Sequence, residues 1–382
     1  NSPRGISTDG TNLYVGDSGN HKIRKIVIET GVVTTLAGSV GSSGSTDGTG
    51  TSARFNDPRA ITTDGTNLYV ADSDNHKIRK IVIATGAVTT LAGSSSYGST
   101  DGTGTSAKFK NLRGITTDGT NLYVTDYSNH TIRKIVISTG VVTTLAGSAG
   151  SSGSTDGTGT AARFNIPRGI TTDGTNLYVV DSSNHKIRKI VISTGAVTTV
   201  AGSGSSGFQD GAGSSAKFSN PREITTDGTN LYVADKDNHR IRKIVISTGA
   251  VTTLAGSGSS GSTDASGTAA SFQSPMGIVF KGTNLYVGDY SNHKIRKIDL
   301  TGTVTAAVKM HNLDDDTDAV VSIASSDTGE ATVSPATLTF TEANWNTDKT
   351  VTVTGVNDTD RDRHQAYKIS LSAADQETSD PQ

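Results

Sequence analysis

Short runs of apolar residues separated by polar turns fill most of the chain. In one stretch the runs are Arg59–Thr63, Asn67–Ala71, Lys77–Ile83 and Ala87–Ala92. Asp64-Gly65, residues 72–75 and Thr85-Gly86 lie between them, and these residue types favour tight turns. Helical periodicity of 3.6 residues is absent. The pattern therefore predicts a four-stranded antiparallel meander of about 54 residues, followed by a Gly/Ser/Thr loop that ends at Phe109.

This meander is a repeat. The stretch Asn67–Ile81, NLYVADSDNHKIRKI, occurs in six copies, and its histidine recurs every 54 or 55 residues, at His21, His76, His130, His185, His239 and His293. The second strand is apolar on both faces, with Leu68 and Val70 on one and Tyr69 and Ala71 on the other. Such a strand is buried between two neighbouring sheets. Radial repetition of four-stranded sheets is a β-propeller, so the sequence predicts an all-β fold with six blades.

Two other repeat architectures do not fit. The Trp-Asp pair of one propeller class is missing, and that repeat is shorter. Calcium-binding nonapeptide arrays recur every nine residues, whereas the DGTG segment here occurs once per unit.

The repeated segments P-R-G-I, N-L-Y-V-A-D and N-H-x-I-R-K-I resemble the NHL repeat, with Ile in the leucine place after one intervening residue. The preceding D-G-x-G-x-x-A-x-F is a frequent companion of such repeats. The resemblance covers residues 1–308 and implies a six-bladed propeller. It does not imply one activity, because the family includes protein-binding, RNA-binding and lyase members and a fold does not determine function.

The two ends of the repeat region raise the question of ring closure. The first copy opens in mid-motif at NSPRG, and the last is expected to end with a fourth strand at 302–308. The ring would then close through side-chain packing between blades one and six, unless the natural N-terminus has been removed. We expect a processed or truncated product, so the lack of a signal peptide says nothing of location.

A second module is expected at residues 309–382. It carries 14 acidic and 5 basic residues, against 22 and 29 in the preceding part. Alternating strands are predicted at 320–325, 331–341, 350–355 and 366–372. The segments L-T-F-T-x-x-N-W-N and T-V-T-V-T-G-V resemble Calx-β and cadherin-like modules of bacterial surface proteins, which implies a β-sandwich in an extracellular chain. Four or five strands are too few for a sandwich of about seven, so either the chain was cut near Gln382 or a neighbouring molecule supplies strands.

Composition excludes several classes of protein. Without cysteine the chain has neither disulfides nor thiolate metal sites. No apolar run reaches the roughly 18–20 residues of a membrane span. The basic residues are spread evenly over the repeats with few aromatics, which argues against nucleic-acid binding.

The repeated polar residues are interpreted as structural. Six histidines on six blades cannot converge on one metal ion, because equivalent atoms of adjacent sheets lie about 10 Å apart. We therefore expect the histidines, the asparagines before them and the aspartates after strand two to be turn and packing residues.

Function is expected where the blades differ. An arginine follows the proline position of five blades, and the sixth has Met276; the five are Arg4, Arg59, Arg113, Arg168 and Arg222. If strand one lines the central channel, these arginines form an anion-binding mouth, since guanidinium groups suit carboxylate, sulfate or phosphate. The alternative is that each arginine pairs locally with a carboxylate. The sixth blade, MGIVFKG, has lost its arginine and its turn aspartate together, which favours that alternative.

Other positions also depart from the repeat: Tyr127, Tyr290, Lys236, Glu223 and the pair 208–209. Exposed aromatics in turns can stack on sugars or anchor a partner, or they can cover a neighbouring turn.

In the acidic module, two clusters of aspartates are candidate calcium ligands, since calcium takes six to eight oxygens. They are Asp314, Asp315, Asp316, Asp318, Asp358, Asp360 and Asp362. The alternative there is a solvated acidic linker.

No catalytic constellation stands outside the repeats, so the sequence favours a protein that is not an enzyme. The first hypothesis is an extracellular binding or adhesion protein of a bacterial surface, with the propeller as a rigid platform for a protein or glycan. The second is a structural subunit of a filament or assembly joined through residues 309–382. The third is an enzyme of the lyase or lactonase kind whose site lies in the channel. Channel residues that differ between blades, together with a bound metal, would favour this hypothesis.

Overall fold

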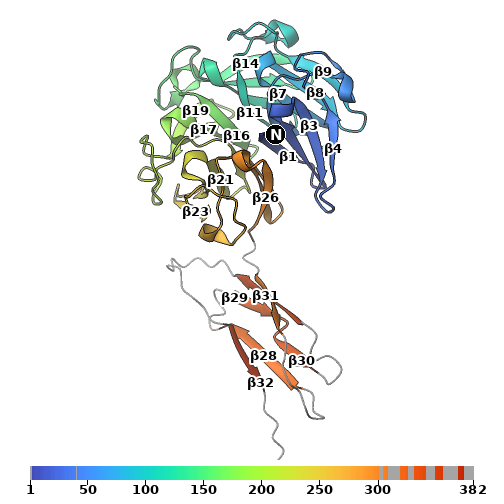
Figure 1. Cartoon of the computed structure of the whole chain (residues 1–382). Helices are drawn as coiled ribbons and strands as arrows, with labels where there is room; N and C mark the ends of the chain where they lie inside the picture. Colours follow the sequence, from blue (N-terminus) through green and yellow to red (C-terminus); the bar gives the residue numbers. More distant parts are fainter. Residues whose placement is uncertain are drawn as a thin grey trace, which may run out of the picture. The chain divides into compact units, whose positions relative to one another are not determined.

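The computed structural model describes residues 2–39, 41–300, 304–308, 319–325, 331–340, 349–355 and 369–373. The chain divides into two compact units, Asn1–Ile298 and Asp299–Gln382. The first unit is a propeller of six antiparallel sheets arranged around a centre (Figure 1). None of the helices in the described residues is long and apolar enough to cross a membrane.

The first three strands recur in every blade. The innermost strands are β1 (Pro3–Thr8), β6 (Pro58–Thr63), β11 (Leu112–Thr117), β16 (Pro167–Thr172), β20 (Ile224–Thr226) and β24 (Pro275–Lys281). The second strands are β2 (Asn12–Asp17), β7 (Asn67–Asp72), β12 (Asn121–Asp126), β17 (Asn176–Asp181), β21 (Asn230–Asp235) and β25 (Asn284–Asp289). The third strands are β3 (Lys22–Val27), β8 (Lys77–Val82), β13 (Thr131–Val136), β18 (Lys186–Val191), β22 (Arg240–Val245) and β26 (Lys294–Asp299). The second strands are buried on both faces, as their sequence predicts.

The outer strands differ between blades. Fourth strands are β4 (Val33–Ala37), β9 (Ala87–Ala92), β14 (Val141–Ala146), β19 (Ala196–Ala201) and β23 (Val251–Ala255). Short loop strands add a fifth to three sheets: β5 (Gly48–Thr49), β10 (Gly102–Thr103) and β15 (Gly157–Thr158). The prediction of four strands per blade was therefore incomplete, because the Gly/Ser/Thr loops before blades two, three and four each pair with the fourth strand of the blade that follows.

Short 3₁₀ turns connect the strands. Those between strands two and three are η1 (Ser18–Asn20), η3 (Ser73–Asn75), η5 (Tyr127–Asn129), η7 (Ser182–Asn184), η8 (Lys236–Asn238) and η10 (Tyr290–Asn292). Those in the loops are η2 (Gly50–Ser52), η4 (Gly104–Ser106), η6 (Gly159–Ala161) and η9 (Gly267–Ala269).

The sixth blade departs from the prediction. Among the described residues its sheet has three strands, β24, β25 and β26. The segment predicted as its fourth strand forms β27 (Val304–Val308), which pairs with β31 (Lys349–Gly355) in the second unit. The boundary between the units accordingly lies near residue 299 rather than 308. An alternating strand pattern identifies a strand but not its partner.

The second unit has two three-stranded antiparallel sheets in its described part. Their orders are β27-β31-β29 and β30-β28-β32, where the other members are β28 (Ala319–Ser325), β29 (Ala331–Ser334), β30 (Thr337–Phe340) and β32 (Ile369–Ala373). The single strand predicted at 331–341 is in fact two strands in different sheets. The break falls at Pro335, whose missing N–H group cannot extend a ladder.

The repeated Asp, Asn and Arg hold each loop onto its blade. In the third blade Arg133 donates to Asp126 at 2.8 Å and to Asp101 of the loop at 2.6 Å. Its guanidinium carbon lies 5.0 Å from the centre of the Phe109 ring. Asn129 donates to Asp126 at 2.8 Å and to a loop carbonyl. The loop motif D-G-x-G-x-x-A-x-F thus supplies the partners of a buried arginine.

The repeated histidines join adjacent blades. In each blade the Nδ1 atom accepts a hydrogen bond of 3.1–3.3 Å from a backbone N–H of the next blade. The sixth, His293, accepts from Ser2 of blade one, and β24 contacts β1. Tyr286 and Val279 of the sixth blade pack with Ile6 of the first. The expected packing between blades one and six is therefore present, together with the same hydrogen bond that joins the other blades.

Replacing His130 by Asn is expected to destabilise the propeller by about 1 kcal/mol, the usual net value of one hydrogen bond. Asn tolerates the left-handed backbone at this position, where φ is +60°. Burial lowers the pKa of His130 below its usual value of 6.5, with Lys110 adding to the shift. This contribution to stability is therefore complete above pH 6.5 and lost as the pH falls. Urea unfolding of the wild type and the His130→Asn variant at pH 8 and pH 5 measures this contribution. An equal difference in the free energy of unfolding between the two proteins at both pH values would contradict the role of His130 as a neutral acceptor.

Candidate functional site

The first strands of the six blades surround a central channel. Residues of all six line a cavity of about 470 Å³ of free space, part of it open to solvent. The pairing of β1, β6, β11 and β16 with their second strands shifts register at or next to the arginine. Such bulges redirect a side chain away from the regular alternation. The expectation that strand one lines the channel is thus met.

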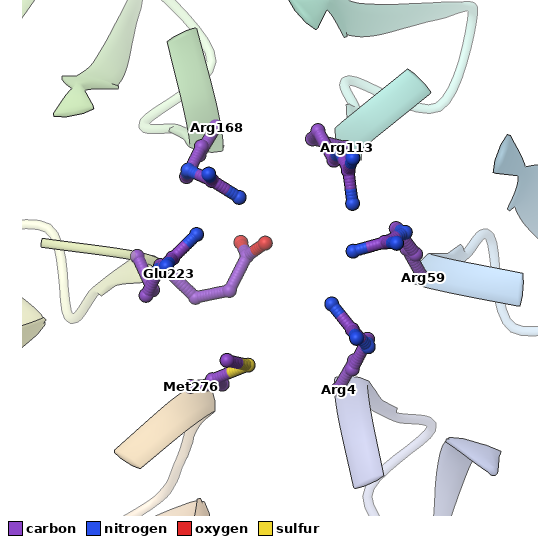
Figure 2. Close-up of a pocket in the computed structure, with 7 residues that line it drawn as sticks. Arg4, Arg59, Arg113, Arg168, Glu223 and Met276 are labelled. Atoms are coloured by element: carbon purple, nitrogen blue, oxygen red, sulfur yellow. The ribbon is translucent and has the colours of Figure 1, made fainter. Parts of the chain in front are cut away.

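The structure brings all five predicted arginines to one end of this channel. Arg4, Arg59, Arg113, Arg168 and Arg222 line a single cavity of about 310 Å³ of free space, part of it open to solvent. Figure 2 shows the labelled arginines pointing toward a common centre, with Met276 at the place of the sixth. We call this set of five arginines, Glu223 and Met276 the arginine mouth.

Local carboxylates pair with only part of the ring. Asp57 forms ion pairs with Arg59 and, at 3.8 Å, with Arg4. For Arg113, Arg168 and Arg222, no ion pair to a carboxylate exists within the described part of the chain. The alternative of purely local pairing therefore accounts for two of the five arginines.

Each guanidinium group also has at least one nitrogen without a hydrogen-bond partner among the described residues. The Nε atom of every arginine in the mouth is buried without one, and so is one terminal nitrogen of Arg113. Burial lowers the pKa of Arg168 to about 10, and the neighbouring Arg222 adds to this shift. Burial also lowers the pKa of Arg222 and of Arg59. An anion at the centre would supply the missing acceptors and would offset the repulsion among these cations.

Two of the unusual aromatic residues support the ring. The Tyr127 ring lies 4.5 Å from the guanidinium carbon of Arg113 and 4.7 Å from that of Arg168, and its hydroxyl accepts from Arg168 at 3.3 Å. Tyr290 accepts a hydrogen bond from Arg4 in the same way. These tyrosines stack on arginines of the mouth. In contrast, Phe208 lies outside the mouth, 3.7 Å from the guanidinium carbon of Arg240.

Glu223 is the residue whose place the sequence did not reveal. The sequence showed it only as a departure from the repeat, yet its carboxyl lies inside the mouth (Figure 2). A signal was present, since it directly follows one of the five arginines at a position that holds Gly or Ala in the other copies.

The seven candidate calcium-binding aspartates lie outside the described residues. Among the residues that the structure does describe, no group of three or more His, Cys, Asp or Glu side chains could hold a metal ion.

Comparison with known proteins supports the repeat assignment. No model of a protein family matches the chain. NHL repeat-containing protein 2 of Gallus gallus is 28% identical over 345 residues, covering 80% of this chain and 47% of the relative. The human protein of that name is 28% identical over 326 residues, covering 75% and 45%. The chain is similar to NHL-repeat proteins. It spans about half the length of these relatives.

Solved structures agree on the fold. A Bacteroides thetaiotaomicron protein of unknown function has a TM-score of 0.59 at 22% identity, with 77% of this chain and 68% of that chain covered. An auxiliary nutrient binding protein of the same species has a TM-score of 0.58 at 20% identity, with the same coverage. At these identities the likeness establishes the propeller alone.

Proposed function

We propose that the chain is a non-enzymatic binding protein that holds an anionic group of its ligand in the arginine mouth. The observation that carries the proposal is a ring of five partly exposed arginines whose Nε atoms are buried without acceptors. Buried polar groups without partners are unfavourable, so such a ring is stabilised by a bound anion. Carboxylate, sulfate and phosphate all match the planar donor geometry of guanidinium.

The proposed setting is a bacterial surface or the extracellular space, with the propeller as a rigid platform for a protein or glycan. Acidic groups of a glycan or protein carry the carboxylate or sulfate that the mouth would bind. The neighbour described as an auxiliary nutrient binding protein is compatible with a binding role through the shared fold.

Binding of inorganic phosphate and sulfate to the full chain, measured by calorimetry, tests the mouth. Replacing Arg113 and Arg168 together by Met copies the residue of the sixth blade and is expected to weaken binding at least about tenfold, since each charge-assisted bond contributes roughly 1.5–3 kcal/mol. Replacing exposed Lys297 by Met removes a cation elsewhere and serves as the control. Equal affinities of the double variant and the control would refute the proposal.

A structural role in an assembly is the second candidate. In the described part of the second unit, β27, β29, β30 and β32 are edge strands, and open edges can pair with strands of another molecule. Light scattering of the full chain distinguishes the two roles. A defined oligomer that dissociates when residues 304–382 are removed would support assembly, and a monomer at all concentrations would exclude it.

The calcium site stays a prediction from the sequence of the second unit. A site with millimolar affinity, as in extracellular modules, is expected to stabilise that unit by about 1–2 kcal/mol at ten times its dissociation constant. Thermal unfolding with and without calcium measures this gain, and magnesium is the control. An unchanged transition would count against a folded site.

A further inference from the structure

Among the residues that the structure describes, Glu223 is the one that brings a carboxyl group to the lining of the arginine mouth. The equivalent position holds Gly or Ala in the other five copies: Gly5, Ala60, Gly114, Gly169 and Gly277. In the blade that contains Glu223 the innermost strand β20 begins only at Ile224, whereas the other innermost strands begin before the arginine or methionine of the mouth. The Glu223 side chain lines both the mouth and the channel behind it.

The Glu223 carboxyl faces the centre of the mouth without a fixed partner. Figure 2 shows it directed into the space between the arginines. No hydrogen bond or ion pair joins it to any residue that the structure describes. Its enclosure raises the pKa of Glu223 to about 8, although Arg168 and Arg222 oppose the shift. At neutral pH the carboxyl is therefore mostly protonated and can donate a hydrogen bond.

The charged groups around Glu223 come from every blade except the last. They are Arg4 on β1, Arg59 on β6, Arg113 on β11, Arg168 on β16 and Arg222 beside it, while β24 contributes the uncharged Met276. Tyr127, Asp57 and Asp237 lie next to these arginines at the rim. The arginines stay charged up to pH 9, since even Arg168 has a pKa of about 10. Glu223 is thus the group of the mouth whose charge changes near pH 8.

We infer that Glu223 shares one proton with the anion bound in the mouth, so that the site distinguishes anions that carry a proton from those that do not. The inference rests on the proposed function. Near neutral pH the Glu223 hydroxyl donates to an oxygen of either sulfate or phosphate. Above pH 8 the carboxylate repels sulfate, which has no proton. Hydrogen phosphate keeps its own proton and donates it to the carboxylate, so the hydrogen bond persists with donor and acceptor exchanged.

Calorimetric titration of the full chain with phosphate and with sulfate, at pH 7 and pH 9, tests the inference. Sulfate affinity is expected to fall roughly tenfold between these values, following the protonated fraction of a group with a pKa near 8. Phosphate affinity is expected to change less than about threefold. Repeating the sulfate titration at pH 9 in buffers of different ionisation enthalpy is expected to show uptake of nearly one proton.

Two variants separate Glu223 from other effects of pH. Glu223→Gln keeps a permanent amide donor, so its sulfate affinity is expected to be independent of pH. Glu223→Ala copies Ala60 of the second blade and is expected to fold, to bind both anions and to lose the discrimination at pH 9. If wild-type sulfate affinity is the same at pH 7 and pH 9, the proton-sharing inference is wrong although the mouth binds anions. If neither anion binds at pH 7, the proposed function is wrong and the inference falls with it.

Discussion

Replacing Arg133 by Met is expected to lower the free energy of unfolding of the propeller by about 3–5 kcal/mol, the cost of leaving one partner of a buried ion pair uncompensated. The Arg133 and Asp126 side chains are both fully buried. Burial already raises the pKa of Asp126 to about 6, and Arg133 is among the groups that oppose the rise. Without Arg133 this carboxyl keeps its hydrogen bonds from Asn129 and the Lys110 backbone but loses its counter-ion, so that either leaving it charged or protonating it costs more free energy at pH 8 than at pH 5. The loss is therefore expected to be larger at pH 8 than at pH 5.

The repeat provides a matched control for this experiment. Arg24 occupies the same place in the first blade, but its side chain is 30% exposed and its contact with Asp17 is 3.7 Å long. Exposed ion pairs contribute less than about 1 kcal/mol, so replacing Arg24 by Met is expected to have a small effect. Urea unfolding of both variants gives the comparison. If the Arg133→Met and Arg24→Met variants lose similar amounts of unfolding free energy, burial of the Arg133–Asp126 ion pair is not the reason why Arg133 stabilises the propeller.

The sequence predicted the blades well because their signal is both local and repeated. Turn pairs such as Asp64-Gly65 fix the hairpins, and an apolar second strand such as β7 fixes the stacking of sheets. Six copies of one pattern then leave little choice of architecture. The interpretation of the histidines as packing residues is confirmed, and the structure adds what they pack against.

Pairing between distant segments could not be predicted in the same way. Nothing in the sequence of β27 says that its partner is β31. The contact of the loop residue Asp101 with Arg133 joins positions 32 residues apart, and neither residue differs from its copies. Comparing copies shows what is repeated but not which repeated residues meet.

The mouth could be predicted as far as its arginines, because their equivalent positions on six blades must meet around one axis. The role of Glu223 could not, since whether its side chain turns into the channel depends on the local course of the chain before β20. The absence of carboxylate partners for Arg113 is likewise a property of the folded chain. The acidic departure Glu223 lies among the five arginines, and whether function lies where the blades differ stays a prediction.

The Glu223→Gln variant is expected to be more stable than the wild type at pH 9 and to differ from it by less than about 1 kcal/mol at pH 5. The pKa of Glu223 rises from 4.5 to about 8 on folding because the carboxyl is buried. A carboxyl whose pKa is raised in the folded state stabilises the protein only while it is protonated. Its contribution is complete below pH 4.5 and is lost as the pH rises to 8, by about 3–5 kcal/mol in total. Glutamine does not titrate, so the variant keeps its stability over this interval.

Urea unfolding of both proteins between pH 5 and pH 9, in buffers free of phosphate and sulfate, measures the difference. Histidine titration and all other groups contribute equally to the two curves, so the gap between them isolates Glu223. A gap that widens steadily from about pH 5 to pH 8 and then stays constant is the expected result. Parallel curves would mean that the carboxyl ionises as easily in the propeller as in the unfolded chain, which requires the five guanidinium groups to compensate its burial completely. In that case Glu223 would be a permanent counter-ion of the arginine mouth and could not share a proton with a ligand.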